Sequence, residues 1–210
     1  MFFVICLFFN FQVNYRTPFK NINKYTLNNQ TQQAYQQIIG VCKEIFRKKT
    51  LDYGTAWRIL RLPSVTDQIF IKAQRIRSIQ EKGTQQVQDS IPDEFVGIIN
   101  YCIIAMMQIE LASSDKLEMQ YEELEPIYDK IADNTLQLLT HKNHDYGEAW
   151  RDMRVSSITD IILMKLLRVK QIEDNQGKTL ISEGIQANYQ DIINYSVFAL
   201  IKLNFTADKR

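Results

Sequence analysis

The residues best suited to chemistry are lysines and arginines that stand in pairs three positions apart. Arg58 and Arg61 form one pair, and Lys72 and Arg75 form another. On a helix, side chains three residues apart lie on one face, so each pair can hold the oxygens of a phosphate or a carboxylate. The same spacing also suits cations that pair with acids of a neighbouring helix. Both interpretations stay open.

The cations belong to a repeated pattern. The phrase D-Y-G-T-A-W-R at 52–58 returns as D-Y-G-E-A-W-R at 145–151, a shift of 93 residues (145 − 52). Each cation recurs at this shift, and I-I-N-Y at 98–101 recurs at 192–195 after a one-residue slip. The pattern indicates a tandem duplication and predicts two halves packed about a pseudo-two-fold axis. The second set of cations comprises Arg151, Arg154, Lys165 and Arg168.

The acidic residues differ between the two copies. Asp191 and Asn194 place two oxygen ligands three residues apart, a spacing that suits magnesium. In the first copy Gly97 replaces Asp191, while Glu94 stands where the second copy has Asn188. We predict that Asp191, Asn194 and Glu94 hold Mg²⁺ or Mn²⁺. The alternative is that the asparagines are hydrogen-bonded core amides and the acids are solvated charges at helix ends.

The repeated phrase also offers aspartate and aromatic side chains. Its aspartate suits a turn or a ligand contact, and its tryptophan suits either a gap between helices or stacking on a base. The predicted substrate-binding residues are Asp52, Tyr53, Trp57, Arg58, Arg61, Asp145, Tyr146, Trp150, Arg151 and Arg154. The predicted catalytic residues are Asp191, Lys165, Arg168, Lys72 and Arg75, the cations serving to neutralise charge that develops on phosphates.

Helices must position these residues. Apolar residues at spacings of three and four over 31–49 predict an amphipathic helix. Ser64 with Asp67, and Ser157 with Asp160, fit the capping box that starts a helix. A third helix per half is expected to begin near Pro92 and near residue 184. The predicted fold is all-α, a tandem duplication of a three-helix unit packed as one pseudo-two-fold helical bundle.

The predicted domain organisation has four parts. Residues 1–29 form a disordered extension, or a stretch upstream of the true start, because residues 14–30 are polar and asparagine-rich without helical periodicity. The apolar run before them is too short to span a bilayer. Residues 31–112 form the first helical repeat, 113–125 an acidic linker, and 126–204 the second repeat.

Composition narrows the function classes. A formal net charge of +1 argues against a polybasic protein that binds membranes or coats nucleic acid. Three widely spaced cysteines argue against a disulfide framework, which favours a cytoplasmic location. The sequence contains no Walker loop, no dinucleotide-binding glycine motif and no G-x-S-x-G. An enzyme of this kind would therefore rely on carboxylates, a hard metal and cations.

At these motifs the sequence resembles a known family. D-Y-G-x-A-W-R, the Lys/Arg helix and the I-I-N-Y helix resemble the nucleotide modification associated domain, type one, in its tandem double-copy bacterial form, over about 31–203. The resemblance implies a helical protein associated with nucleotide or DNA-base modification. The family phrase D-L-A-N-Y is matched by Asp191, Asn194 and Tyr195, whereas Gly97 departs from it. The chain also distantly resembles the all-α nucleoside triphosphate pyrophosphohydrolases of the MazG group, with D-x-x-N in place of their paired acids.

We therefore expect a protein that binds a nucleotide or a nucleotide-like phosphate compound. If it is an enzyme, we expect a metal-dependent hydrolase of phosphoanhydrides. A second copy of the chain, in a homodimer, is an expected partner, and a membrane is not. The alternative is a non-enzymatic helical module that binds a protein or a nucleic acid.

Overall fold

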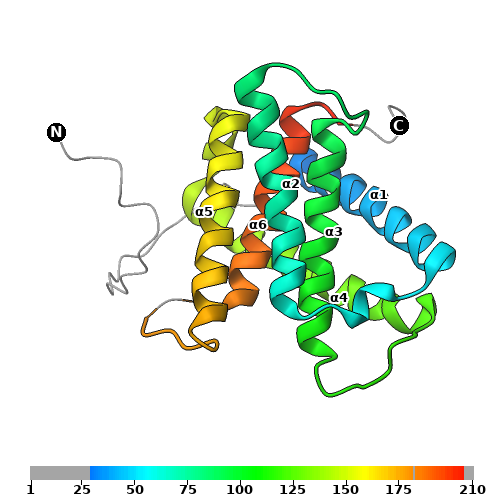
Figure 1. Ribbon diagram of the computed structural model, residues 1–210. Coiled ribbons are helices and arrows are strands. Elements are labelled where there is room, and N and C mark those ends of the chain that lie inside the picture. Colours follow the sequence, from blue (N-terminus) through cyan, green and yellow to red (C-terminus); the bar gives the residue numbers. More distant parts are fainter. Residues whose placement is uncertain (1–28, 182, 206–210) are drawn as a thin grey trace.

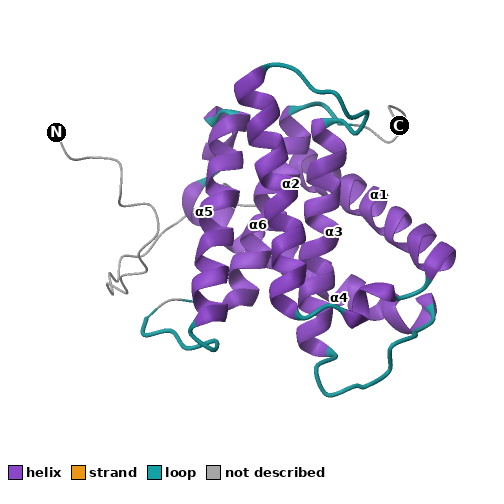
Figure 2. Cartoon of the chain, in the orientation of Figure 1, coloured by secondary structure: helices purple, strands orange, loops and turns teal. Residues whose placement is uncertain are grey.

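The computed structural model describes residues 29–181 and 183–205, and every regular element within them is a helix (Figure 2). The extension expected at 1–29 lies outside the described residues except for Asn29. The first repeat holds α1 (Asn29–Tyr53), α2 (Leu62–Lys82) and α3 (Ile91–Glu110). The second holds α4 (Tyr121–Tyr146), α5 (Val155–Asp174) and α6 (Ile185–Lys202). Short 3₁₀ helices, η1 (Ala56–Ile59) and η2 (Ala149–Asp152), follow α1 and α4.

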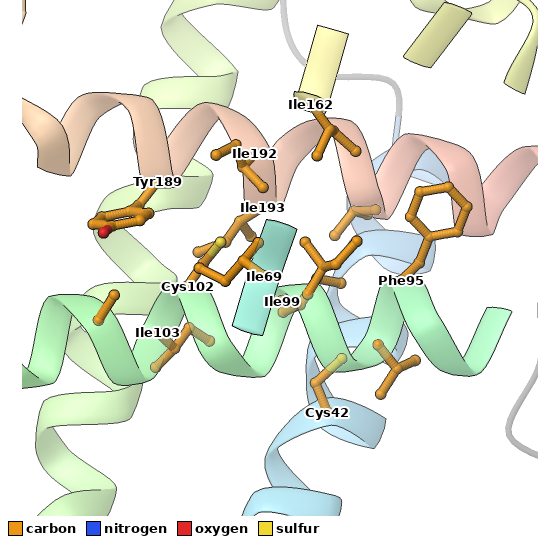
Figure 3. Packing of buried hydrophobic residues seen from close by; sticks show 14 of the residues in the cluster. Cys42, Ile69, Phe95, Ile99, Cys102, Ile103, Ile162, Tyr189, Ile192 and Ile193 are labelled. Carbon is orange, nitrogen blue, oxygen red and sulfur yellow. The ribbon is translucent and has the colours of Figure 1, made fainter. Parts of the chain in front are cut away.

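Four helices form the centre of the molecule. α2, α3, α5 and α6 pack side by side, and α1 and α4 pack against α3, α6 and each other (Figure 1). The buried apolar side chains form one cluster shared by both repeats. Ile99 and Cys102 of α3 face Ile193 of α6 at its centre, with Ile69 of α2 beside them (Figure 3). The all-α class is thus confirmed.

Polar contacts between the repeats occur in symmetric pairs. Thr66 on α2 donates to the Glu173 carboxylate on α5 at 2.7 Å, and Gln80 on α2 donates to Thr159 on α5 at 3.2 Å. Thr159 is the counterpart of Thr66, and Glu173 is the counterpart of Gln80, so the same contact is made twice with the repeats exchanged. This exchange is expected of a two-fold interface. It confirms that the duplication packs as one pseudo-two-fold bundle.

A second symmetric pair joins the outer helices to the core. The Tyr35 hydroxyl on α1 donates to Asn194 Oδ1 on α6 at 3.1 Å. The Tyr128 hydroxyl on α4 donates to Asn100 Oδ1 on α3 at 3.0 Å. Each outer helix therefore reaches into the other repeat.

Two predicted helix starts were wrong. α2 begins at Leu62, with Arg61 at its N-cap, so Ser64 lies inside the first turn and not before it. A proline in the first turn explains the early start, because its fixed φ is already helical. α5 also begins directly after an arginine at its N-cap, Arg154, although no proline stands in its first turn. A capping box does occur at Ser90, before α3.

The acids assigned to those capping boxes instead join α2 to α5. Asp67 lies 2.6 Å from the Lys170 ammonium, and Asp160 lies 3.8 Å from the Arg77 guanidinium. These two ion pairs are also related by the pseudo-two-fold axis. No helix within the described residues is long and apolar enough to cross a membrane.

The repeated phrase forms the same turn in both halves. Gly54 and Gly147 have φ values of 66° and 61°, which residues with a Cβ rarely adopt. Their amides donate to carbonyls four residues earlier and so close the long helix before it. The turn redirects the chain into η1 or η2 and brings the tryptophan back towards the bundle.

Candidate functional site

The second repeat buries a carboxylate between two lysines. Asp191 Oδ2 lies 2.5 Å from Lys165 Nζ, and Asp191 Oδ1 lies 2.5 Å from Lys142 Nζ. The side chains of Asp191 and Lys165 are only 7% and 3% exposed. One turn later on α6, burial and then the negative charge of Asp191 raise the pKa of Tyr195 to about 12.

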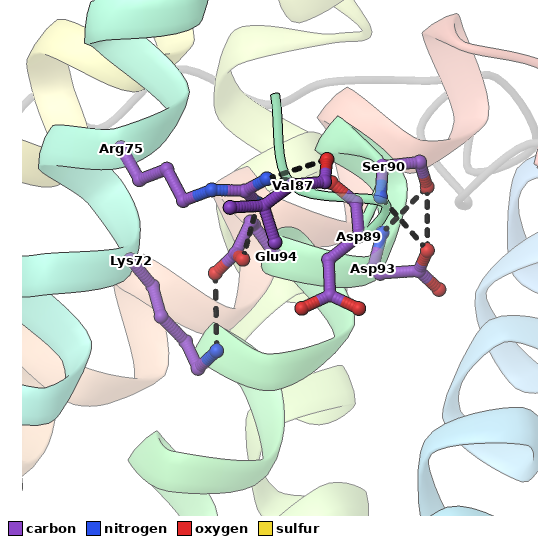
Figure 4. A network of polar contacts seen from close by, with 7 residues as sticks. All are labelled: Lys72, Arg75, Val87, Asp89, Ser90, Asp93 and Glu94. Carbon is purple, nitrogen blue, oxygen red and sulfur yellow. Dashed lines mark hydrogen bonds and ion pairs between the residues drawn. The ribbon is translucent and has the colours of Figure 1, made fainter. Parts of the chain in front are cut away.

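The first repeat has a related cluster with a different acid. Glu94 on α3 lies 3.0 Å from Lys72 Nζ and 2.5 Å from Arg75 Nη1, both on α2 (Figure 4). Arg75 also donates to the Asp89 carbonyl at 2.8 Å, which ties the loop before α3 to α2. Glu94 stands three residues before Gly97, the counterpart of Asp191. The buried carboxylate has therefore moved one helical turn between the repeats.

A cavity of about 560 Å³ adjoins this first cluster. The cavity is lined by the end of α1, by η1, by α3 from Asp93 to Ile104, by Asp89 of the loop before α3, and by one residue of α2. Its aromatic lining comprises Phe46, Tyr53, Trp57 and Tyr101, and its charged lining comprises Lys49, Lys72, Asp89, Asp93 and Glu94.

Two residues that line the cavity are smaller than their counterparts in the second repeat. Gly97 and Ile104 both line it, where the second repeat has Asp191 and Phe198. The Phe198 ring stacks on Trp150 with 4.3 Å between ring centroids and 1° between planes. Trp150 is buried, whereas its counterpart Trp57 is half-buried. In the second repeat, the larger side chains of Asp191 and Phe198 occupy the positions that Gly97 and Ile104 hold in the first.

The predicted residues separate into those at the cavity and those elsewhere. Lys72, Glu94, Tyr53 and Trp57 line it together, with Arg75 bound to Glu94. Tyr53 is 59% exposed, and its pKa is raised by partial burial and then by Tyr101 and Asp52. The predicted residues that are exposed and not part of its lining are Asp52, Arg61, Asp145, Tyr146, Arg154 and Arg168.

Arg58 and Arg151, which we expected to orient a polyphosphate, bind protein groups instead. Arg58 donates to the Gln108 side chain and to the carbonyls of Leu111, Ser114 and Lys116. It thereby holds the connection between α3 and α4. Arg151 donates to Glu148 at 2.5 Å, and its guanidinium lies 4.6 Å from the centre of the Trp150 ring.

The predicted metal site is not assembled. Glu94 pairs with Lys72 and Arg75 of α2. Asp191 pairs with Lys142 of α4 and Lys165 of α5, so the two carboxylates belong to separate clusters. The oxygen of Asn194 that would bind a metal accepts the Tyr35 hydrogen bond. Within the described residues no group of three or more His, Cys, Asp and Glu side chains could hold a metal ion. The asparagines are core amides, as the alternative interpretation proposed.

Sequence reasoning missed two contributors to the site. Lys49 and its counterpart Lys142 keep the 93-residue shift and stand three positions before the repeated aspartate. That recurrence was a usable signal. Tyr101 recurs as Tyr195 within I-I-N-Y, but we interpreted this segment only as core.

The fold and the site define a duplicated all-α protein with a buried acid–cation cluster in each half and a cavity in the first. The family model described as Nucleotide modification associated domain 1 matches residues 49–109 and again 142–203. The chain belongs to this family, as a tandem double-copy member. No curated protein and no solved structure matches the chain.

Proposed function

We propose that the first-repeat cavity binds a nucleotide or a nucleotide-like phosphate compound. The observation that carries the proposal is one cavity lined both by lysines and by aromatic rings. Its volume of about 560 Å³ falls within the roughly 300–1,000 Å³ of typical small-molecule sites. Family membership adds an association with nucleotide modification.

The aromatic side supplies flat surfaces for a base. Tyr53, Trp57 and Tyr101 come from α1, η1 and α3 and meet at the cavity. Stacking on such rings contributes about 1–3 kcal/mol per base and tolerates different bases. The arrangement therefore favours a compound with a planar ring without selecting the base.

The cationic side supplies contacts for phosphate. Lys49 is exposed and makes no ion pair with a described residue, and Lys72 shares Glu94 with Arg75. Arg75 can hold Glu94 when Lys72 turns to a ligand. The described carboxylates do not form a metal site, so binding, and not metal-dependent hydrolysis, is the function that the geometry supports best.

Thermal-shift and calorimetric titrations with ribo- and deoxyribonucleoside mono- and triphosphates test the proposal. Binding raises the melting temperature in proportion to ligand excess over Kd. Lys49→Ala is expected to weaken binding about tenfold, or about 1.4 kcal/mol. Lys48→Ala removes a neighbouring exposed lysine outside the cavity and should leave Kd unchanged.

Two results would count against nucleotide binding. One is the absence of any shift across the panel, and the other is an equal Kd for Lys49→Ala and the wild type. Affinity for DNA that falls steeply with salt would instead favour the interaction module. A parallel assay for pyrophosphate release, with and without Mg²⁺ or Mn²⁺, tests hydrolysis separately.

A further inference from the structure

Two side chains of the second repeat indicate how a ligand fits the cavity of the first repeat. We infer that the ligand places an anionic group against Gly97, between Lys49 and Lys72, and a flat ring against Trp57. These are the positions that the Asp191 carboxylate and the Phe198 ring occupy in the second repeat. The inference rests on the proposed function and deepens it: the ligand carries both groups, and one chain binds it at one site.

The anion position follows from three pairs of counterparts. Lys142 and Lys165 approach the two oxygens of Asp191, each at 2.5 Å. Their counterparts in the first repeat, Lys49 and Lys72, line the cavity together with Gly97. The first repeat therefore keeps both lysines, but its carboxylate, Glu94, lies one turn earlier and pairs with Lys72, which leaves Lys49 without an ion pair among the described residues.

Lys72 already lies where a side chain of residue 97 would begin. A Cβ built on Gly97 would stand 2.8 Å from Lys72 Cε and 3.1 Å from Lys72 Nζ. The stem of Lys72 therefore covers Gly97, and an anion reaches the Gly97 backbone only when the Lys72 side chain turns aside, while Arg75 keeps Glu94 paired. Only Lys49 of the two lysines has no ion pair among described residues, so the anion would also give it a partner.

The ring position follows from Trp150. Its indole is covered by the Phe198 ring, stacked at 4.3 Å and nearly parallel. In the first repeat Ile104 replaces that ring, and both Ile104 and Trp57 line the cavity. Asp191 and Phe198 stand seven residues apart on α6, about 10 Å along the axis and on the same face. The ligand should span this separation, as a ring and phosphates joined by a sugar can.

Gly97→Asp tests the anion position. The substitution supplies to the first repeat the carboxylate that the second already has, and only the flexible end of Lys72 must move. Binding of inorganic pyrophosphate and of nucleoside triphosphates should fall at least tenfold. Gly97→Asn is the matched control, since it has the same shape without the charge and should lose less. Melting temperatures of both variants without ligand check that the fold is kept.

Ile104→Phe tests the ring position. It should weaken the binding of a nucleoside triphosphate and leave pyrophosphate binding unchanged. Equal weakening of both ligands would overturn the ring assignment. Calorimetry should give a stoichiometry of one ligand per chain. A stoichiometry of two ligands per chain would contradict the inference, because the second repeat would then also bind the ligand.

The outcomes separate this inference from the proposed function. If nucleotides bind Gly97→Asp as well as the wild type, the anion position is wrong and the proposed function stands. If pyrophosphate binding is lost in Gly97→Asp but no nucleotide binds the wild type, the proposed function is wrong and the anion position is supported. If the wild type binds neither, both fail.

Discussion

The two buried acids are each paired with two cations, of which only Lys165 is itself fully buried. Asp191 has almost no contact with water and gives one oxygen to each of two lysines. Taking such a group out of water is costly, and the cost is offset only while its partners remain. Glu94 is held in the same way by Lys72 and Arg75. Three of the four cations that we expected to be catalytic, Lys72, Arg75 and Lys165, therefore stabilise these carboxylates.

Asp191→Asn should destabilise the protein by about 3–5 kcal/mol, because Lys165 would stay buried without a counter-charge. Urea unfolding followed by circular dichroism measures the change. Asp52→Asn is the control, since Asp52 is exposed and its removal should alter stability by less than about 0.5 kcal/mol. An unchanged urea midpoint for Asp191→Asn would contradict the structural role of this ion pair.

Glu173 illustrates how burial affects a single carboxyl. Burial raises its pKa above the ordinary 4.5, and the charges of Asp67 and Asp174 raise it further, although Thr66 and Tyr189 donate to it. The folded state therefore holds the Glu173 proton more tightly than the unfolded state. Stability is lost as pH rises from the ordinary pKa through the raised one.

Glu173→Gln should consequently raise the melting temperature at pH 7, while at pH 3 the variant and the wild type should match. The counterpart position is already a glutamine, Gln80, which bonds Thr159 at the symmetric place. Melting curves from pH 3 to pH 8 measure the difference. Asp133→Asn, an exposed change on α4, controls for net charge. A gain that is independent of pH would refute the titration argument.

At the scale of elements, hydrogen bonds to the short connections determine how the chain passes from one helix to the next. The Arg58 guanidinium binds three carbonyls between residues 111 and 116, so one side chain orders the path from α3 to α4. Thr55 adds two bonds to the same connection, donating to the Leu117 carbonyl and accepting from the Met119 amide. The first turn phrase thus also fixes where the second repeat starts.

Arg58→Met should speed amide hydrogen exchange at 111–119 more than elsewhere, because the bonded carbonyls lose their charged donor. The overall loss of stability should be about 1.5–3 kcal/mol, the range for bonds to charged groups. Exchange measured by mass spectrometry tests this. Arg61→Met removes an exposed arginine at the α2 N-cap and should leave exchange at 111–119 unchanged. Uniform acceleration across the chain would argue against a local role.

The helices were predictable from the sequence to different degrees. Apolar periodicity and the repeat predicted six helices and the pairing of the halves, because both depend on local spacing. The starts of α2 and α5 were misplaced, since a serine with a following acid also fits a capping box when the acid pairs with another helix. The role of Asp191 was not readable, because Lys142 lies 49 positions away on α4. The cavity could not be predicted either, since it depends on which side chains meet across helices.

At the scale of the molecule, the two repeats share one core. Duplication left both acid–cation clusters, yet Gly97 and Ile104, which are smaller than their counterparts Asp191 and Phe198, line a cavity in the first repeat. Under the proposed function, the first half of this fused pair binds the ligand and the second half supports the fold. The symmetric contacts between the repeats explain why the supporting half is retained.

Neither repeat should fold alone, because the central helices of each half bury their apolar faces against the other. α3 packs on α6 and α2 on α5, and the Tyr35–Asn194 and Tyr128–Asn100 bonds cross between the halves. A half expressed alone exposes this surface, and so small a core is marginally stable. We expect residues 29–112 and 113–205, expressed separately, to unfold without cooperativity. Co-expressed, they should form a 1:1 complex with a cooperative transition, measured by calorimetry and light scattering. A monomeric half with its own sharp transition would show that the repeats are independent domains.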